Sequence, residues 1–159
     1  MRFIALSVLA LVGVSAQAAP QQLAPEAFVG NYKLVEARYG LLCEDPMQGL
    51  LSKSLEKSDD KYVQIDLGPF YFPAVNAGPQ KFEDDLSTSM SESGTTATSL
   101  VFQSREVSKI DGEVSTQVIV AEFQGDKLHI TSTSKFAHQG GTKGETRHEC
   151  VYQKVPAQK

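Results

Sequence analysis

Three consecutive segments with alternating apolar residues, joined by two short turn signals, constrain the fold of this chain most strongly. Residues 99–110 end at Asp111-Gly112, residues 113–123 follow, and Gly125-Asp126 leads into residues 127–136. Asp-Gly and Gly-Asp pairs between alternating segments are typical of two-residue β-hairpin turns. We therefore expect three antiparallel strands connected in sequence.

The side chains of these strands are predicted to share one apolar face. With two-residue turns, the first hairpin places Phe102 opposite Ala121 and the second places Ala121 opposite Ile130. Both hairpins put the same residues on this face: Leu100, Phe102, Ile119, Ala121, Phe123, Leu128 and Ile130. Toward the other end of the strands the face becomes polar, at Ser104, Gln117, Ser132 and Ser134.

The rest of the chain also favours strands. Further segments of strand character lie at residues 28–38, 62–67, 70–72, 81–90 and 145–154. Connections of hairpin length join nearly all eight segments, so we predict an all-β fold, an eight-stranded antiparallel up-and-down barrel. Pairing of the last strand with the first would remove the open edges. A β-sandwich is the alternative.

One short helix is expected after the first strand, between Pro46 and Lys57. Asp45 can cap it, and Pro46 suits the first helical position. The apolar residues of this segment fall on one helical face: Met47, Leu50, Leu51 and Leu55. We expect the helix to close one end of the barrel.

The two cysteines of the chain, Cys43 and Cys150, are predicted to form a disulfide. A pair so distant in sequence lacks the close spacing that tunes redox-active thiols, so the bridge is interpreted as structural. In the chain-entropy model, closing a loop of about 100 residues stabilises a fold by about 4–5 kcal/mol. Such bridges form and persist in oxidising compartments.

The N-terminus is typical of an export signal. Arg2 supplies a positive start, an apolar run covers residues 3–14, and Ala16-Gln17-Ala18 gives the small-x-small pattern of a cleavage site. We predict a signal peptide of residues 1–18, a single β-barrel domain of residues 19–159, and a periplasmic or secreted location. The apolar run is too short to span a bilayer comfortably, so no membrane anchor is expected.

A short motif at the start of the first strand resembles that of the lipocalin and calycin group. Phe28-Val29-Gly30-Asn31-Tyr32 is similar to the lipocalin Gly-x-Trp motif, with Tyr32 in place of the tryptophan. The resemblance implies a small barrel whose interior can hold an apolar ligand. It also implies that an arginine of the last strand, Arg147, covers Tyr32. A Thr-Asp-Tyr run, the second signature of lipocalins, is absent from the sequence.

The leading functional hypothesis is an exported, non-enzymatic, lipocalin-like protein that binds a small apolar or amphipathic ligand. An eight-stranded barrel is either filled by side chains or encloses one small molecule. In the second case the seven residues of the shared apolar face would line the cavity, with the serines near one end. In the first case the same residues pack together as a core.

The alternative hypothesis is a protein-binding module, such as a protease inhibitor or an envelope assembly factor. The face opposite the predicted core is unusually apolar for a face in contact with solvent. It carries Val101, Val107, Val114, Val118 and Val120. An exposed apolar patch of this kind can mark a protein interface.

Other functional classes find little support in the sequence. The formal net charge is −4 and no basic patch alternates with aromatic residues, which argues against a nucleic-acid partner. His129, His138 and His148 follow no metal-ligand spacing, so no metal or other cofactor is expected. No Gly-x-Ser-x-Gly elbow frames a serine nucleophile, so we do not expect an enzyme.

Overall fold

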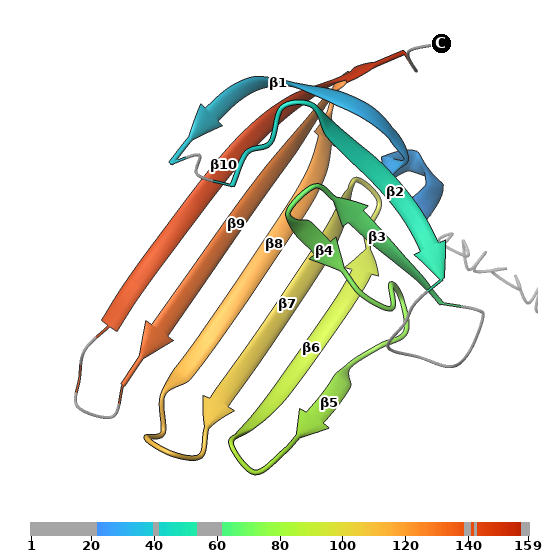
Figure 1. Cartoon of the computed structure of the whole chain (residues 1–159). Helices are drawn as coiled ribbons and strands as arrows, with labels where there is room; N and C mark the ends of the chain where they lie inside the picture. Colours follow the sequence, from blue (N-terminus) through green and yellow to red (C-terminus); the bar gives the residue numbers. More distant parts are fainter. Residues whose placement is uncertain (1–21, 40–41, 54–61, 139–140, 142, 157–159) are drawn as a thin grey trace, which may run out of the picture.

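The structure is a computed structural model that describes residues 22–39, 42–53, 62–138, 141 and 143–156. It contains a 3-10 helix, η1 (Pro25–Phe28), and ten strands (Figure 1). The strands are β1 (Gly30–Arg38), β2 (Met47–Lys53), β3 (Val63–Leu67), β4 (Phe70–Phe72), β5 (Gln80–Glu83), β6 (Ser87–Thr95), β7 (Ser99–Ser108), β8 (Val114–Gln124), β9 (Lys127–Ala137) and β10 (Lys143–Val155).

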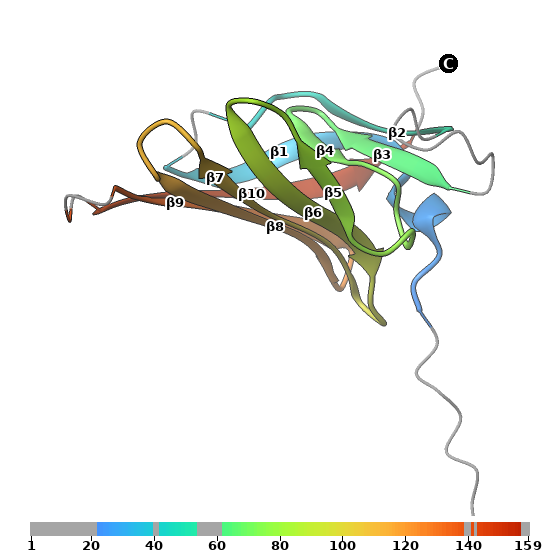
Figure 2. The same cartoon turned by 90° about the horizontal axis from the view of Figure 1, so that it is seen from below.

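All ten strands belong to one antiparallel sheet in the order β4-β3-β2-β1-β10-β9-β8-β7-β6-β5. The predicted pairing of the last strand with the first is confirmed, because β10 lies beside β1. The sheet curls into a half-barrel that stays open between β4 and β5 (Figure 2). The all-β, up-and-down class is therefore confirmed, but the barrel has ten strands rather than eight and does not close by strand pairing.

The connection between β4 and β5 bridges this opening without forming a strand. The backbone N–H of Val75 donates to the carbonyl of Val63, and that of Asn76 donates to the carbonyl of Ser93. The Asn76 side chain also bonds Thr95, accepting from its backbone N–H at 2.8 Å and donating to its hydroxyl at 3.2 Å. The two edges of the half-barrel are thus tied together at one end.

The predicted helix after the first strand is wrong: residues 47–53 form β2. Met47 and Gly49 are buried and alternate with exposed residues, whereas Leu50, expected on the apolar helical face, is 47% exposed. β2 pairs with β1 on one side and with β3 on the other, so its backbone N–H and C=O groups are hydrogen-bonded within the sheet. A helix over the same residues would be weakened by Gly49, because glycine destabilises helix interiors. Leu55 and the predicted helix end at Lys57 lie outside the described residues.

The tenth strand arises because the segment predicted at 81–90 divides into β5 and β6. The side chain of Asp84 accepts hydrogen bonds from the backbone N–H groups of Leu86 and Ser87, at 2.8 and 2.7 Å. These bonds form an aspartate turn in the middle of the predicted strand. Ser93, Gly94 and Thr95 continue the second of these strands and end β6.

The two predicted hairpin turns have different outcomes. Gly125-Asp126 forms the expected two-residue turn, and Ala121 lies opposite Ile130 as predicted. In the first hairpin Phe102 lies opposite Ile119, not Ala121, because residues 109–112 form a four-residue loop. A type I′ turn needs positive φ at both central residues, and at this position only Gly112 has it. The two-residue shift keeps every side chain on its predicted face.

The hydrophobic core lies where β1–β4 and η1 cover one end of the concave face (Figure 1). Its residues are Phe28, Tyr32, Met47, Ile65, Leu67, Phe70, Phe72, Val75, Leu100, Ile119, Ala121, Leu128, Ile130, Cys150 and Tyr152. The predicted disulfide between Cys43 and Cys150 is confirmed, and it ties the β1–β2 connection to β10. Among the described residues, no helix is long and apolar enough to cross a membrane.

The cover predicted for Tyr32 is provided by another residue. Lys154, which lies opposite Tyr32 in the register, places its Nζ 5.8 Å from the ring centroid. Arg147 instead lies opposite Thr133 and pairs with Glu149 at 2.6 Å. The expectation for Arg147 is wrong because the register places it seven residues away from the strand position that faces Tyr32. The predicted signal peptide lies outside the described residues.

Candidate functional site

The seven residues predicted to line a ligand cavity do lie on one face. Five are almost completely buried in the core: Leu100, Ile119, Ala121, Leu128 and Ile130. Phe102 and Phe123 are partly buried and pack against them. These side chains form the covered end of the concave face, and a contact with a ligand stays a prediction.

The open space lies at the other end of the same face. There β6–β10 extend beyond β1–β4 and leave the concave surface uncovered (Figure 1). This surface holds a cavity of about 540 Å³, a volume in the range of small-molecule sites. We call it the serine groove and define it by the side chains that face it: Ser89, Ser91, Ser104, Glu106, Glu113, Ser115, Gln117, Ser134, Phe136 and Thr146.

The strand register arranges these side chains in rows across the sheet. One row runs from β5 to β10 and is entirely polar: Gln80, Ser91, Ser104, Gln117, Ser134 and Thr146. The next row has an aromatic ring on each side of a carboxylate: Phe82, Ser89, Glu106, Ser115, Phe136 and Gly144. Neighbouring positions in a row are about 5 Å apart, so one small molecule can reach several of them.

The polar groups of the groove have few partners within the protein. Six hydroxyl groups and the Gln117 amide make no side-chain hydrogen bond with any described residue; the hydroxyls are those of Ser89, Ser91, Ser104, Ser115, Ser134 and Thr146. Glu106 likewise forms no ion pair in the described part of the chain. Where groove meets core, the Ser93 hydroxyl is buried without a partner. The groove thus offers several unused donors and acceptors to a ligand.

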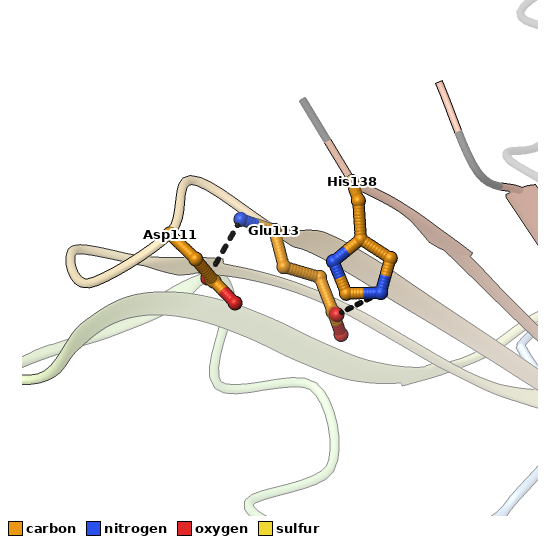
Figure 3. Close-up of side chains that lie close together, drawn as sticks. All are labelled: Asp111, Glu113 and His138. Carbon is orange, nitrogen blue, oxygen red and sulfur yellow. Dashed lines mark hydrogen bonds and ion pairs between the residues drawn. The ribbon is translucent and has the colours of Figure 1, made fainter. Parts of the chain in front are cut away.

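An acidic cluster with one histidine forms the outer end of the groove (Figure 3). Nε2 of His138 lies 2.8 Å from a carboxylate oxygen of Glu113, and the backbone N–H of Glu113 donates to Asp111 at 3.1 Å. Hydrogen bonds from the Ser108 hydroxyl and from the Glu113 backbone hold the pKa of Asp111 below its usual value. Asp111 is therefore ionised at neutral pH.

Asp111, Glu113 and His138 are the described residues best placed to hold a metal ion. Their ligand atoms all lie within 4.8 Å of one another. Two carboxylates and an imidazole suit several divalent ions by ligand type. The His138–Glu113 contact already uses two of these groups within the protein, and exposed acidic clusters are common without an ion.

The three histidines do not converge on one site. His129 lies opposite Glu122 on the convex face. His148 lies opposite Ser132 on the concave side, where its Nδ1 bonds the backbone carbonyl of Tyr39. His138 contacts Glu113, so the three histidines lie in separate places on the sheet.

The convex face carries the five valines of the alternative hypothesis. Val118 is 41% exposed, and the other four are half-buried among their strand neighbours. A second hollow, of about 360 Å³, adjoins Val118 and the 53% exposed Met90, with Gln103 and Arg105 at its side. The predicted apolar outer face is therefore present.

The extent of the groove was not predicted from the sequence. Ser104, Gln117 and Ser134 lie at the predicted polar end of the face, whereas Ser89 and Ser91 on β6 are not among the residues predicted to share it. The signal was present in the alternation of serine at positions 87, 89, 91 and 93, which in a strand directs all four side chains to one face. Comparison of the chain with models of protein families, with curated proteins and with solved structures found no match.

Proposed function

We propose that the protein is an exported, non-enzymatic binding protein that holds a small amphipathic ligand in the serine groove. One observation carries the proposal: a cavity of small-molecule size is lined by hydroxyl and amide groups that have no partner among the described residues. Polar groups that converge in a concave surface fix the orientation of a ligand.

The amphipathic character of the ligand follows from the sides of the groove. Phe136 is 39% exposed on β9, and Phe82 is 62% exposed on β5. The register places both rings in the row whose centre is Glu106. A molecule with polar groups over the serines therefore meets apolar surface at either side. A purely apolar ligand would leave the serine and glutamine groups without partners, which is unfavourable.

A binding role accounts for the groove better than catalysis does. A serine hydrolase needs a hydroxyl within hydrogen-bond reach of a base. In the described residues no groove serine bonds a histidine, and His138 is engaged with Glu113. Export rests on the leader-like N-terminus and on the disulfide, which suits an oxidising compartment.

A pair of variants on one strand tests the proposal. Ser134→Arg places a large cationic side chain in the middle of the groove, between Gln117 and Thr146. Thr133→Arg places the same side chain on the opposite face of β9, and so serves as the matched control. Ligands that co-purify with the protein are measured by native mass spectrometry, and added amphiphiles by calorimetry. Binding should be lost in Ser134→Arg and kept in Thr133→Arg; equal binding by both would contradict the proposal.

The convex face supports a second candidate, a protein-binding module. The exposure of Val118 and Met90 beside a shallow hollow is the observation that favours it. Val118→Lys would then weaken capture of a partner, or self-association measured by sedimentation velocity at increasing concentration. The groove variants would leave that association unchanged.

A further inference from the structure

The charge of the serine groove is one-sided. Two carboxylates, Glu106 and Glu113, line it, while no lysine or arginine side chain occupies the groove rows of β5–β10. Lys154, on the concave face of β10, lies over Tyr32 at the covered end. Lys135 borders the cavity, but it belongs to the convex face of β9, and its Nζ lies 3.3 Å from the Glu145 carboxylate. The groove therefore attracts positive charge and disfavours anions.

The basic residues near the open end do not cancel this charge. Lys109 and Lys81 both bind Glu83, at 3.0 and 2.9 Å, and Lys109 also donates to the backbone carbonyl of Asp84. Arg105 lies on the convex face beside Thr116. Among the residues that the structure describes, His138 is the basic group that contacts an acidic groove residue, and its partner is Glu113 rather than Glu106.

Glu106 stands out as the free carboxylate of the groove. It forms no ion pair in the described residues, and it lies in the row between Phe82 and Phe136, two strands from each. At two strands' distance, about 10 Å, neither ring reaches a cation bound at Glu106, so the carboxylate holds the charge and the rings offer apolar surface to the rest of the ligand. Glu113 is a diagonal neighbour on β8, about 7–8 Å away by the usual spacing of such pairs.

We infer that the ligand of the serine groove is an amphiphile with a cationic head group, an amine or a quaternary ammonium, held at Glu106. This inference rests on the proposed function, because it names the class of ligand for the same groove. The hydroxyl groups of the adjoining row accept and donate hydrogen bonds to polar atoms next to the charged head.

Three amphiphiles with the same tail separate the charge of the head from the binding of the tail. Decyltrimethylammonium, decanoate and decyl maltoside are titrated into mature protein by calorimetry, each below its critical micelle concentration. The cationic compound should bind about tenfold more tightly than decanoate, and added salt should reduce this difference. Equal affinities, or tighter binding of decanoate, would overturn the assignment of a cationic ligand.

Two charge variants locate the effect. Glu106→Gln keeps the shape of the side chain and should weaken decyltrimethylammonium about two- to fivefold, with little change for decyl maltoside. Glu92→Gln removes the same charge from the convex face of β6 and should change neither. If Glu92→Gln weakened binding as much as Glu106→Gln, long-range charge rather than the groove would be responsible, and the inference would fail.

The same titrations distinguish failure of this inference from failure of the proposed function. Binding of decyl maltoside or decanoate that Ser134→Arg abolishes would keep the groove as the binding site while rejecting its cationic preference. Binding of none of the three compounds would contradict both.

Discussion

The ring of Phe136 lies across the backbone of Gly144 on the neighbouring strand. A Cβ atom added to Gly144 would lie 2.1 Å from two carbons of this ring. Phe136 and Gly144 are opposite each other in the β9–β10 pairing, at the side of the serine groove. Glycine at this position is therefore what allows the aromatic ring to lie over β10 and form one side of the groove.

Replacing this glycine should move the ring. In Gly144→Ala the Phe136 side chain has to rotate away from β10, at a cost of about 1–2 kcal/mol in the free energy of unfolding because ring and methyl compete for one space. Urea denaturation measures this cost, and the ring-proton shifts of Phe136 report the displacement. In a Phe136→Ala background the same substitution should cost almost nothing. A similar cost in both backgrounds would show that Gly144 is needed for another reason.

A second close approach, at Gly49, involves backbone rather than a movable ring. A Cβ on Gly49 would lie 2.1 Å from the carbonyl oxygen of Phe28, at the end of η1. Gly49→Ala must therefore displace η1 or β2, and we expect a loss of about 3 kcal/mol or more. Gln48→Ala, at the exposed neighbouring position, is the control and should lie within about 0.5 kcal/mol of the native protein. Chemical denaturation of both variants checks this expectation.

The sequence predicted the concave face correctly even though one register was wrong. Alternation over three strands determines which side chains share a face, and a shift of two residues preserves that set. The exact pairing depended on the first turn. Gly125 supplies positive φ at the first central position of its turn, as a type II′ turn requires, whereas Asp111-Gly112 offers a single positive φ at its second residue.

The strand at residues 47–53 was missed because local and tertiary preferences disagree. Asp45, Pro46 and the spaced leucines favour a helix locally, but the partners of β2 are β1 and β3, and the residues paired with β3 are 10 to 18 positions apart in sequence. Pairing with distant strands cannot be inferred from the spacing of apolar residues within one segment. The full extent of the groove could not be predicted for a related reason. How far β1–β4 cover the concave face decides which end of it stays open, and this depends on tertiary packing.

Removing the disulfide should lower the stability of the native state substantially. Cys43 and Cys150 are separated by 107 residues, for which the chain-entropy model gives about 4–5 kcal/mol. We expect the Cys43→Ala/Cys150→Ala double variant to lose about this free energy of unfolding, measured by urea denaturation. Adding a reductant should destabilise the native protein to the same extent and leave the double variant unchanged. An effect of reductant on the double variant would point to a cause other than this bridge.

Two buried tyrosines on neighbouring strands differ in how their hydroxyl groups are satisfied. The Tyr32 hydroxyl donates to the carbonyl of Phe28 at 3.0 Å. The Tyr152 hydroxyl is buried and forms no hydrogen bond with a described residue. The backbone N–H of Glu44 is close enough to influence its pKa. Tyr32→Phe should therefore cost about 1 kcal/mol, while Tyr152→Phe should be neutral or stabilising. Urea denaturation at neutral pH compares the two.

The same tyrosines should make the fold sensitive to alkali. Burial raises the pKa of both Tyr32 and Tyr152 to about 12, against about 10 in the unfolded chain. The native state keeps the tyrosine protons that the unfolded state releases. The contribution of the two tyrosines to stability is therefore complete below pH 10. It is lost as the pH rises through 12, at up to about 1.4 kcal/mol per pH unit for each residue. In the Tyr32→Phe/Tyr152→Phe variant, the free energy of unfolding measured between pH 9 and 12 should fall less steeply than in the native protein. Parallel curves would mean that these hydroxyl groups ionise as readily in the folded chain as in the unfolded one.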